Sequence, residues 1–347
     1  MSDILLLSLG TTSGLRAGDE ALAQMMRKAG ADVALSRVKI GATGALRRAH
    51  PVIDLVEALA ARRALSSALA RARPRAVIFS TSTSALLSPK LDVPYAVRLD
   101  APSCLNRPGA RNALQHALER RRLRDAAILL PFGSAGAAAL PAGCAEAVVL
   151  PQPILPSGPL VHEREPIAVA YTPDPKAKGL ATVLQAWSQS RLAERACLEV
   201  FGIEQERAMR HLRRERIEQP SGVRWRGRVP AAQFRARLRA AHVFLTGARW
   251  EDYGFAQLEA LADGALLVCG ASGGPFEALA HARELAPQLC AGTLRPADLA
   301  AALRLAFAMP DSEAARYREQ ASNRIAAYAP EVVERLISQR VLPALLR

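Results

Sequence analysis

Two glutamates surround a tight glycine turn in the stretch GARWEDYGFAQLEALADGALLVCG. Glu251 and Glu259 stand eight positions apart, with Gly254 between them. A strand-like VFLTG precedes the pair, and an apolar helix and a second strand-like run follow it. Glutamates at this spacing are often only solvated side chains, and that alternative stays open. The strand, turn and helix around them favour a functional role at the end of a strand.

The turn itself has the features of an anion site. Gly254 permits a positive φ or a close approach of another backbone. A helix that opens at Phe255 and Ala256 presents N–H groups without intrahelical partners. Because these N–H groups carry the positive end of the helix dipole, this position suits a pyrophosphate.

A lysine stands in a comparable place earlier in the chain. The sequence has only five lysines against 41 arginines, yet Lys176 and Lys178 lie in one short segment. Lys178 directly precedes Gly179, after a predicted strand and at the start of a predicted helix. A lysine there can reach a phosphate as a point charge. The alternative is an exposed loop charge.

The first half of the chain predicts alternating strands and helices. A buried strand is followed by a glycine-rich loop that ends at Gly14. This loop does not match G-x-G-x-x-G, so dinucleotide binding is unsupported. Alternation of strand and helix is typical of a parallel sheet. The predicted strands are 4–9, 31–38, 76–80, 95–99 and 126–130, and the predicted helices are 17–29, 51–72 and 111–124.

The second half predicts another such series after a break. Residues 150–159, LPQPILPSGP, carry four prolines and a glycine and predict an inter-domain linker. We therefore expect two Rossmann-like, doubly wound α/β domains, 1–156 and 157–330, facing a cleft. Open parallel sheets bind ligands outside the carboxyl ends of their strands. The last helix, 331–347, is expected to pack back on the first domain.

Composition restricts the class of protein. Half of the 347 residues are hydrophobic, and five scattered cysteines with no C-x-x-C pair fit a reducing cytoplasm. The apolar run in MSDILLLSLG is too short for a signal peptide. No histidine or cysteine spacing predicts a metal site. The net charge of +14 indicates either an anionic partner or an arginine-rich composition. Few aromatic residues interleave with the basic clusters ERRRLR (119–124) and RHLRRER (210–216), which disfavours nucleic-acid binding.

The chain resembles the retaining, nucleotide-sugar-dependent glycosyltransferases of the GT-B fold, specifically family 4. The resemblance covers most of the sequence and lies chiefly in YTPDPKAKGLATVLQAW, in LEVFG, in the segment VRWRGRVPAAQF to ALADGALLV, and in GASGGPFEAL. It implies that Glu251 holds donor-sugar hydroxyls and that Glu259 accepts hydrogen bonds from the ribose. It also implies that Lys178 stabilises the leaving diphosphate. The loop at Gly14 would approach the donor phosphates.

Two positions depart from the family pattern. Thr172 stands where family members usually carry an arginine of the donor site, and Asp100 stands where many carry a histidine. Asp100 could bind acceptor hydroxyls or act as a base, or it could cap the turn that follows it.

The sequence therefore predicts a cytoplasmic glycosyltransferase that uses a nucleotide-diphosphate sugar and a hydroxyl acceptor, without a metal or other cofactor. The acceptor is a glycan, a lipid-linked molecule or a small molecule. The positive charge also suggests peripheral association with an anionic membrane at its inner face. The alternatives are a non-catalytic glycosyltransferase-like partner subunit and a sugar-nucleotide epimerase or phosphorylase of the same fold.

Overall fold

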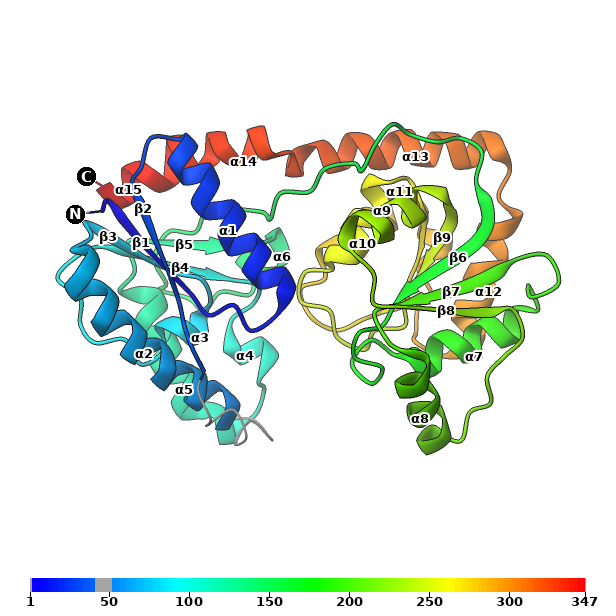
Figure 1. Cartoon of the computed structure of the whole chain (residues 1–347), viewed down its shortest axis with the longest axis horizontal. Helices are drawn as coiled ribbons and strands as arrows, with labels where there is room; N and C mark the ends of the chain where they lie inside the picture. The colour runs from blue at the N-terminus through cyan, green and yellow to red at the C-terminus, as the bar shows by residue number, and fades with distance from the viewer. Residues whose placement is uncertain (1, 41–51, 347) are drawn as a thin grey trace. The chain divides into compact units, whose positions relative to one another are not determined.

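The computed structural model describes residues 2–40 and 52–346, and the chain divides into two compact units. The first unit comprises Met1–Pro153 and Tyr328–Arg347, and the second comprises Ile154–Ala327. Each unit contains one five-stranded sheet whose strands are all parallel, with helices packed on its faces (Figure 1). This α/β architecture of two parallel sheets confirms the predicted fold class.

The sheet of the first unit has the strand order β2-β1-β3-β4-β5. The predicted start of α2 at Pro51 lies outside the described residues. The elements up to the linker are β1 (Ile4–Ser8), α1 (Ser13–Lys28), β2 (Val33–Arg37), α2 (Val52–Ala72), β3 (Ala76–Phe79), α3 (Ser82–Ala85), β4 (Tyr95–Leu99), α4 (Ser103–Asn106), the 3-10 turn η2 (Ala110–Asn112), α5 (Ala113–Arg124), β5 (Ile128–Pro131) and α6 (Ser134–Ala138).

Strand β1 explains why this sheet is covered on both faces. All five of its residues are buried. Ile4 and Leu6 belong to one apolar cluster, and Leu5 and Leu7 belong to another. Because successive side chains of a strand point to opposite faces, an unbroken apolar run requires a core on each side of the sheet.

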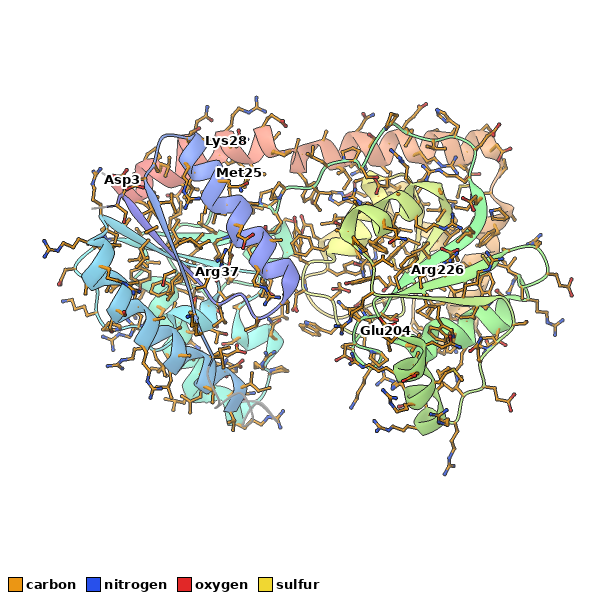
Figure 2. The ribbon with its side chains drawn as sticks, viewed as in Figure 1. Asp3, Met25, Lys28, Arg37, Glu204 and Arg226 are labelled. Atoms are coloured by element: carbon orange, nitrogen blue, oxygen red, sulfur yellow. The ribbon has the colours of Figure 1, made fainter. Side chains whose placement is uncertain are left out.

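The end of the chain completes the core of the first unit. It forms α14 (Pro330–Leu336), a π-helical segment η5 (Ile337–Val341) and α15 (Leu342–Leu346). Side chains four positions apart lie on one helix face, and four of them are fully or nearly fully buried in the same cluster as Met25 of α1. Lys28, at the end of α1, pairs with Glu334 at 2.9 Å (Figure 2). The four buried residues are Val333, Ile337, Val341 and Leu345.

The sheet of the second unit has the order β10-β9-β6-β7-β8. Its elements are β6 (Glu165–Tyr171), α7 (Leu180–Ser190), β7 (Cys197–Phe201), α8 (Gln205–Glu215), β8 (Val223–Gly227), α9 (Ala231–Ala240), β9 (Ala241–Leu245), α10 (Phe255–Ala262), β10 (Leu266–Val268), α11 (Glu277–Leu285), the 3-10 turn η3 (Pro287–Leu289), α12 (Pro296–Ala308), α13 (Asp311–Ile325) and the 3-10 turn η4 (Ala326–Tyr328).

Both strand orders contain a point at which the direction of winding reverses. It lies between β1 and β3 in the first sheet, and between β6 and β9 in the second. Doubly wound sheets bind their ligands outside the carboxyl ends of the strands at such a switch point. In each unit, a ligand site is therefore expected outside the carboxyl ends of the two strands at this switch point. None of the helices in the described ranges is long and apolar enough to cross a membrane.

Candidate functional site

Lys178 and Glu251 form an ion pair at the switch point of the second sheet. Lys178 Nζ lies 2.7 Å from Glu251 Oε1, and the two side chains are 29% and 8% exposed. Lys178 follows β6 and Glu251 follows β9, the neighbouring strands between which the winding reverses. The fold thus brings together two predicted site residues that are 73 positions apart in the sequence.

The loop that carries Lys178 is shaped by Asp174 and Gly179. The Asp174 carboxylate accepts hydrogen bonds from two backbone N–H groups of the loop, at 2.9 and 3.0 Å. Gly179 has a φ of +64°, and a Cβ at this position would lie 2.0 Å from the carbonyl oxygen of Gly247. Since no side chain fits there, glycine allows the loops after β6 and β9 to touch through their backbones.

Glu251 is fixed by three contacts. Gln257 Nε2 donates to Glu251 Oε2 at 2.9 Å, while Lys178 Nζ lies close to Oε1. The backbone N–H of Glu251 donates to the carbonyl oxygen of Gly273 at 3.0 Å, which joins its loop to the loop after β10. The carboxylate therefore has one defined orientation at the sheet edge, supported by a side chain from the first turn of α10.

The N-terminus of α10 opens beside this pair. Gly254 precedes the helix with a φ of +86°, and no side chain caps the helix N-terminus. Phe255 and Ala256 are partly exposed, so their part of the first turn reaches the protein surface. Uncapped N–H groups next to a lysine form a positively charged edge, which can bind the oxygens of a phosphate or diphosphate.

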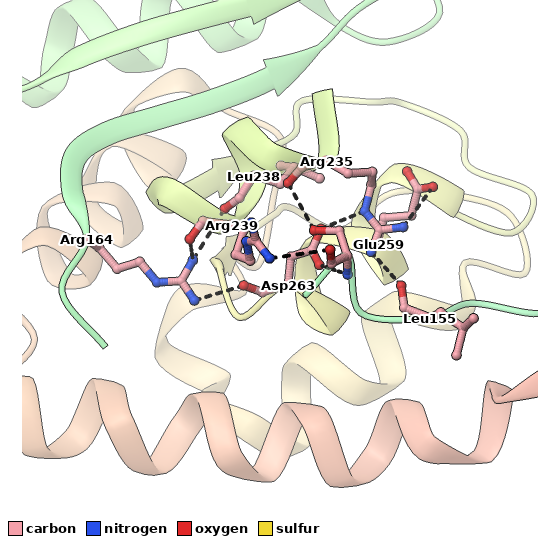
Figure 3. A network of polar contacts seen from close by, with 8 residues as sticks. Leu155, Arg164, Arg235, Leu238, Arg239, Glu259 and Asp263 are labelled. Atoms are coloured by element: carbon pink, nitrogen blue, oxygen red, sulfur yellow. Dashed lines mark hydrogen bonds and ion pairs between the residues drawn. The ribbon is translucent and has the colours of Figure 1, made fainter. Parts of the chain in front are cut away.

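Glu259 lies one turn further along α10 and pairs with an arginine. Its Oε1 lies 3.4 Å from Arg235 Nη1, and its side chain is 28% exposed (Figure 3). Burial raises the pKa of the Glu259 carboxyl above its ordinary value, while the positive charge of Arg235 opposes this shift. Nearby Asp263 adds to the upward shift. The Arg235 charge therefore favours the ionised form of a partly buried carboxylate.

Thr172 lies directly after β6, on the same edge as Lys178. Its side chain is 1% exposed, and its backbone N–H donates to the carbonyl oxygen of Phe201 at 2.9 Å. Its hydroxyl oxygen Oγ1 is buried and has no hydrogen-bond partner within the described part of the chain. A buried hydroxyl without a partner is uncommon in folded proteins. Thr172 thus supplies a small polar group, without the charge of an arginine.

The other two predicted residues belong to the first unit. Gly14 lies in the first turn of α1, is exposed, and has open space where a Cβ would project. Asp100 follows β4, and its Oδ1 accepts a hydrogen bond from the N–H of Ala101 at 2.7 Å. That bond agrees with the turn-capping alternative for Asp100. Both residues lie at the carboxyl edge of the first sheet.

Sequence reasoning did not identify Gln257, Arg235 or the buried pair of Arg98 and Asp19. Gln257 stands two residues before the predicted Glu259, in the first turn of α10 after Gly254. Its side-chain amide donates to Glu251, and no sequence pattern indicates this contact. The arginines have no distinguishing pattern in a chain with so many of them. Their partners lie 24 and 79 positions away in sequence, so no local spacing could reveal them.

The sequence matches one protein family in its second half. Residues 156–324 match the family described as glycosyl transferases group 1. This range contains Lys178, Glu251 and Glu259 and covers nearly all of the second unit. No curated protein sequence is similar enough to this chain to count as a match.

Solved structures of glycosyltransferases share the fold of the whole chain. Sucrose-phosphate synthase from Thermosynechococcus elongatus superposes with a TM-score of 0.75 at 15% identity, covering 98% of each chain. An α,α-trehalose-phosphate synthase (UDP-forming) from Burkholderia xenovorans, in complex with glucose-6-phosphate, gives 0.70 at 13% identity, covering 99% of this chain and 100% of that one. An E. coli structure named for trehalose-6-phosphate and bound with UDP-2-fluoro glucose gives 0.67 at 13%, covering 97% and 99%. The chain has the GT-B fold.

Proposed function

Because residues 156–324 match the glycosyl transferases group 1 family, we propose that the protein transfers a sugar from a nucleotide-diphosphate donor to a hydroxyl acceptor, with retention of the anomeric configuration. The observation that carries this proposal is the Lys178–Glu251 ion pair at the switch point of the second sheet, beside the uncapped start of α10. A charged group and open helix N–H groups at this edge suit a diphosphate.

The demanding step of such a transfer is departure of the nucleoside diphosphate. Negative charge develops on its phosphate oxygens, so a positive group already in place lowers the barrier. Lys178 would supply that charge, and the N–H groups at Phe255 and Ala256 would supply further hydrogen bonds. The glycine contact between the loops after β6 and β9 fixes the backbone from which Lys178 reaches this edge.

The remaining residues of this edge would hold the donor. Glu251 would accept hydrogen bonds from sugar hydroxyls once Lys178 turns toward the diphosphate. Glu259 would accept hydrogen bonds from the ribose. Thr172 would offer its hydroxyl to the donor in place of the arginine found in many relatives. In this scheme the departing phosphate takes the proton from the acceptor hydroxyl, so the protein supplies no separate general base at the anomeric carbon.

Surface charge favours an anionic acceptor. The loop of Lys178 forms one side of a pocket of about 490 Å³, and α8 forms the other. Four basic residues, Lys176, Arg207, Arg210 and Arg214, line this pocket together with two acidic ones, Asp174 and Glu215, so its lining is net positive. One structure with the same fold holds glucose-6-phosphate. We therefore place sugar phosphates first among candidate acceptors.

The protein is proposed to work in the cytoplasm without a resident metal, since Lys178 and α10 would provide the positive charge. The test for metal independence is activity after dialysis against EDTA, which should remain unchanged. A lipid-linked acceptor would bring the protein to the inner membrane face. In the basic segment of α5, residues 120–124, Arg121 and Arg124 both lie within 4 Å of Asp125, at 3.7 and 3.2 Å, so this carboxylate offsets part of the positive charge available for that contact.

A nucleotide-binding panel tests the proposal. UDP, GDP, ADP and dTDP are added separately, and the melting temperature is recorded. A nucleotide that binds only the folded state raises stability by about 2.7 kcal/mol at one hundred times its Kd. The nucleotide that binds then fixes the donor base, and its sugar conjugates are incubated with sugar phosphates and neutral sugars.

The products separate the proposed function from its alternatives. Release of nucleoside diphosphate with formation of an α-linked product from an α-linked donor supports a retaining transfer. Binding without turnover on any acceptor would indicate a non-catalytic partner subunit. Conversion of the nucleotide sugar into its epimer would indicate an epimerase. Absence of any stabilising nucleotide would contradict the proposal.

A further inference from the structure

Arg235 on α9 contacts three partners in the second unit: Glu259 on α10, Asp263 at the C-terminal cap of α10, and Leu155 in the linker segment. Its Nε lies 2.6 Å from Asp263 Oδ2, and its Nη2 donates to the carbonyl oxygen of Leu155 at 2.7 Å. Its third nitrogen, Nη1, lies 3.4 Å from Glu259 Oε1. Figure 3 shows the guanidinium between these groups. The side chain is only 13% exposed, so this is a partly buried arrangement and not a solvated surface pair.

The two short contacts fix the guanidinium. Asp263 is fully buried, and its other carboxylate oxygen accepts a hydrogen bond from the backbone N–H of Ser157 at 2.7 Å. Because a guanidinium is planar, contacts at Nε and Nη2 also fix the direction of Nη1. Arg235 therefore directs Nη1 toward Glu259 through contacts that do not involve Glu259 itself.

Glu259 has one oxygen facing this arginine and one oxygen left over. Within the described residues, the side chain makes its only hydrogen bond through Oε1, to Arg235. Its Oε2 makes no hydrogen bond there, and the side chain retains 28% exposure. An ionised carboxylate is an acceptor at both oxygens, whereas a protonated one has a donor on one of them. The ionised form of Glu259 thus makes Oε2 a stronger, charge-assisted acceptor for a ligand hydroxyl than the protonated form.

We propose that Arg235 is a positioning residue for the ribose of the donor nucleotide, because it orients the Glu259 carboxylate so that Oε2 accepts from the ribose hydroxyls. This inference rests on the proposed function, since it takes the nucleotide to bind at α10. It also links the ribose contact to the linker, because the same guanidinium holds the carbonyl of Leu155.

Ribose discrimination provides a readout that a merely structural role of Arg235 would not change. Isothermal titration compares UDP with 2′,3′-dideoxy-UDP on the full chain. A hydrogen bond to a charged group contributes about 1.5–3 kcal/mol. The wild type should therefore bind dideoxy-UDP about tenfold or more weakly than UDP. In R235Q this ratio should fall below about threefold, as it should in E259Q, and the double variant should lose little more than either single variant.

Arg239 provides a matched control on the same helix. Its Nη1 donates to the carbonyl oxygen of Ser157 at 3.3 Å, so it also contacts the linker, but it makes no contact with Glu259. R239Q should keep the wild-type ratio between the two nucleotides. A lower ratio in R239Q as well would show that loosening the linker is sufficient, and would overturn a specific role for Arg235.

The pH dependence of binding gives a second readout. Arg235 and Asp263 are the charged groups that act on Glu259. Burial already raises the pKa of Glu259, and removing Arg235 removes the interaction that lowers it. UDP binding should therefore weaken as pH falls, and the loss should begin at a higher pH in R235Q than in the wild type. Superimposable pH profiles of the two proteins would overturn the proposal.

The outcomes separate this inference from the proposed function. If the wild type binds UDP and R235Q keeps the full discrimination against dideoxy-UDP, the role of Arg235 is wrong while the donor site stands. If the wild type binds none of UDP, GDP and ADP in the same titration, the proposed function fails and this inference fails with it. Should R235Q not fold, R235K decides, because it keeps the charge but not the planar fork. Its ratio should also fall, and an unchanged ratio would contradict the proposal.

Discussion

Two ion pairs, one in each unit, stand near the carboxyl edges of the two sheets and differ in their access to solvent. Arg98 Nη1 lies 2.9 Å from Asp19 Oδ1 in the first unit, and both side chains are 2% exposed. Lys178 Nζ lies 2.7 Å from Glu251 Oε1 in the second unit, and the lysine is 29% exposed. The distances are similar, so solvent access distinguishes the two pairs.

The first pair is sealed within its unit. Ser8 Oγ donates to Asp19 Oδ2 at 2.6 Å, and the Arg98 guanidinium lies 4.9 Å from the centre of the Phe132 ring. Burial raises the pKa of Asp19, and the charge of Arg98 opposes that shift. Two charges that are buried together cannot exchange partners without a large desolvation cost. This pair therefore serves the structure of the loop edge and not the binding of a ligand.

The second pair is open on the side of the lysine. Lys178 is 29% exposed, so its ammonium group can reach a phosphate from the solvent side. When Lys178 leaves, the Glu251 carboxylate keeps the hydrogen bond from Gln257. Ion pairs of similar length at the carboxyl edges of the two sheets thus differ in role. The lysine of the second pair can reach a ligand because it is exposed to solvent, whereas both members of the first pair are buried.

Removal of the C-terminal helices should have the largest effect, and only on the unit of the sealed pair. A chain lacking residues 331–347 loses four buried side chains from the first core. Burial of such side chains contributes about 1.5–3 kcal/mol each, and the sum is comparable with the whole stability of a domain. Hydrogen exchange should show the first unit unprotected and the second unit protected. Equal protection of both units would show that the helices are not needed there.

Breaking the sealed pair should have the next largest effect. R98M leaves the Asp19 carboxylate buried without its cation, which typically costs about 3–5 kcal/mol of unfolding free energy. Denaturant unfolding of the variant measures this loss. R98M/D19N, which removes both charges, should recover part of the stability. A loss no larger than that of an exposed arginine variant such as R316Q would contradict the structural role.

The pH dependence of the stability of R98M tests the same structural role of the Arg98–Asp19 pair. Without Arg98, the pKa of Asp19 in the folded state should rise further above its value in the unfolded chain. The folded state then binds a proton more readily than the unfolded state, so stability falls as pH rises through the folded pKa. The deficit of R98M relative to the wild type should therefore shrink as pH is lowered. A deficit that is independent of pH would show that Asp19 does not titrate in this way.

Breaking the open pair at its carboxylate should affect activity more than stability. E251Q replaces the buried carboxylate by an amide of the same shape, and Lys178, which is 29% exposed, can turn to solvent, so the unfolding free energy should fall by less than in R98M. Loss of hydrogen bonds to the donor sugar should lower kcat/KM by roughly tenfold to a hundredfold. Thermal unfolding and initial rates on the same preparation measure both quantities. A variant that unfolds easily but turns over normally would reverse the assignment of the two pairs.

The smallest expected effect concerns the basic segment of the first unit. Each basic residue near an anionic surface contributes about 1 kcal/mol, and salt screens it. Since Arg122 is held by a backbone carbonyl of Ser88, and Asp125 offsets part of the remaining charge, about 1–2 kcal/mol is available. Co-sedimentation at low salt should show slight binding to anionic vesicles and none to neutral ones. Equal binding to both would exclude an electrostatic contact.

The elements of the fold, and the positions of Lys178, Glu251 and Gly254 after the carboxyl ends of strands, could be predicted from the sequence. Unbroken apolar runs predict buried parallel strands, and their alternation with helices predicts the two sheets. Lys178 directly precedes Gly179 and Glu251 stands three residues before Gly254, and each pair follows a strand, so local spacing places them at the carboxyl edge of a sheet. The order of the strands then makes Lys178 and Glu251 neighbours.

The contacts of Arg235 and Arg98, which support the two sheet edges, could not be predicted from the sequence. Arg235 and Arg98 are two of 41 arginines, and nothing in their neighbours distinguishes them. Arg98 stands inside a strand that reads as apolar, and its partner Asp19 lies on a helix 79 positions earlier. Packing of distant elements selects these two arginines, so they can be recognised only when the elements are assembled. The π-helical turn at 337–341 is likewise absent from a pattern that predicts one continuous helix.

The most direct test of the central claim, that the open pair of the second unit is the donor-diphosphate site, is the turnover of K178A. Release of nucleoside diphosphate from the donor identified by the binding panel is measured under saturating conditions, beside the melting temperature of the same preparation. Loss of one preorganised positive charge on a leaving group typically lowers kcat by about a hundredfold or more. We expect this loss with an unchanged melting temperature. A kcat within about threefold of the wild type would contradict the account, since it would correspond to less than about 1 kcal/mol of transition-state stabilisation from Lys178.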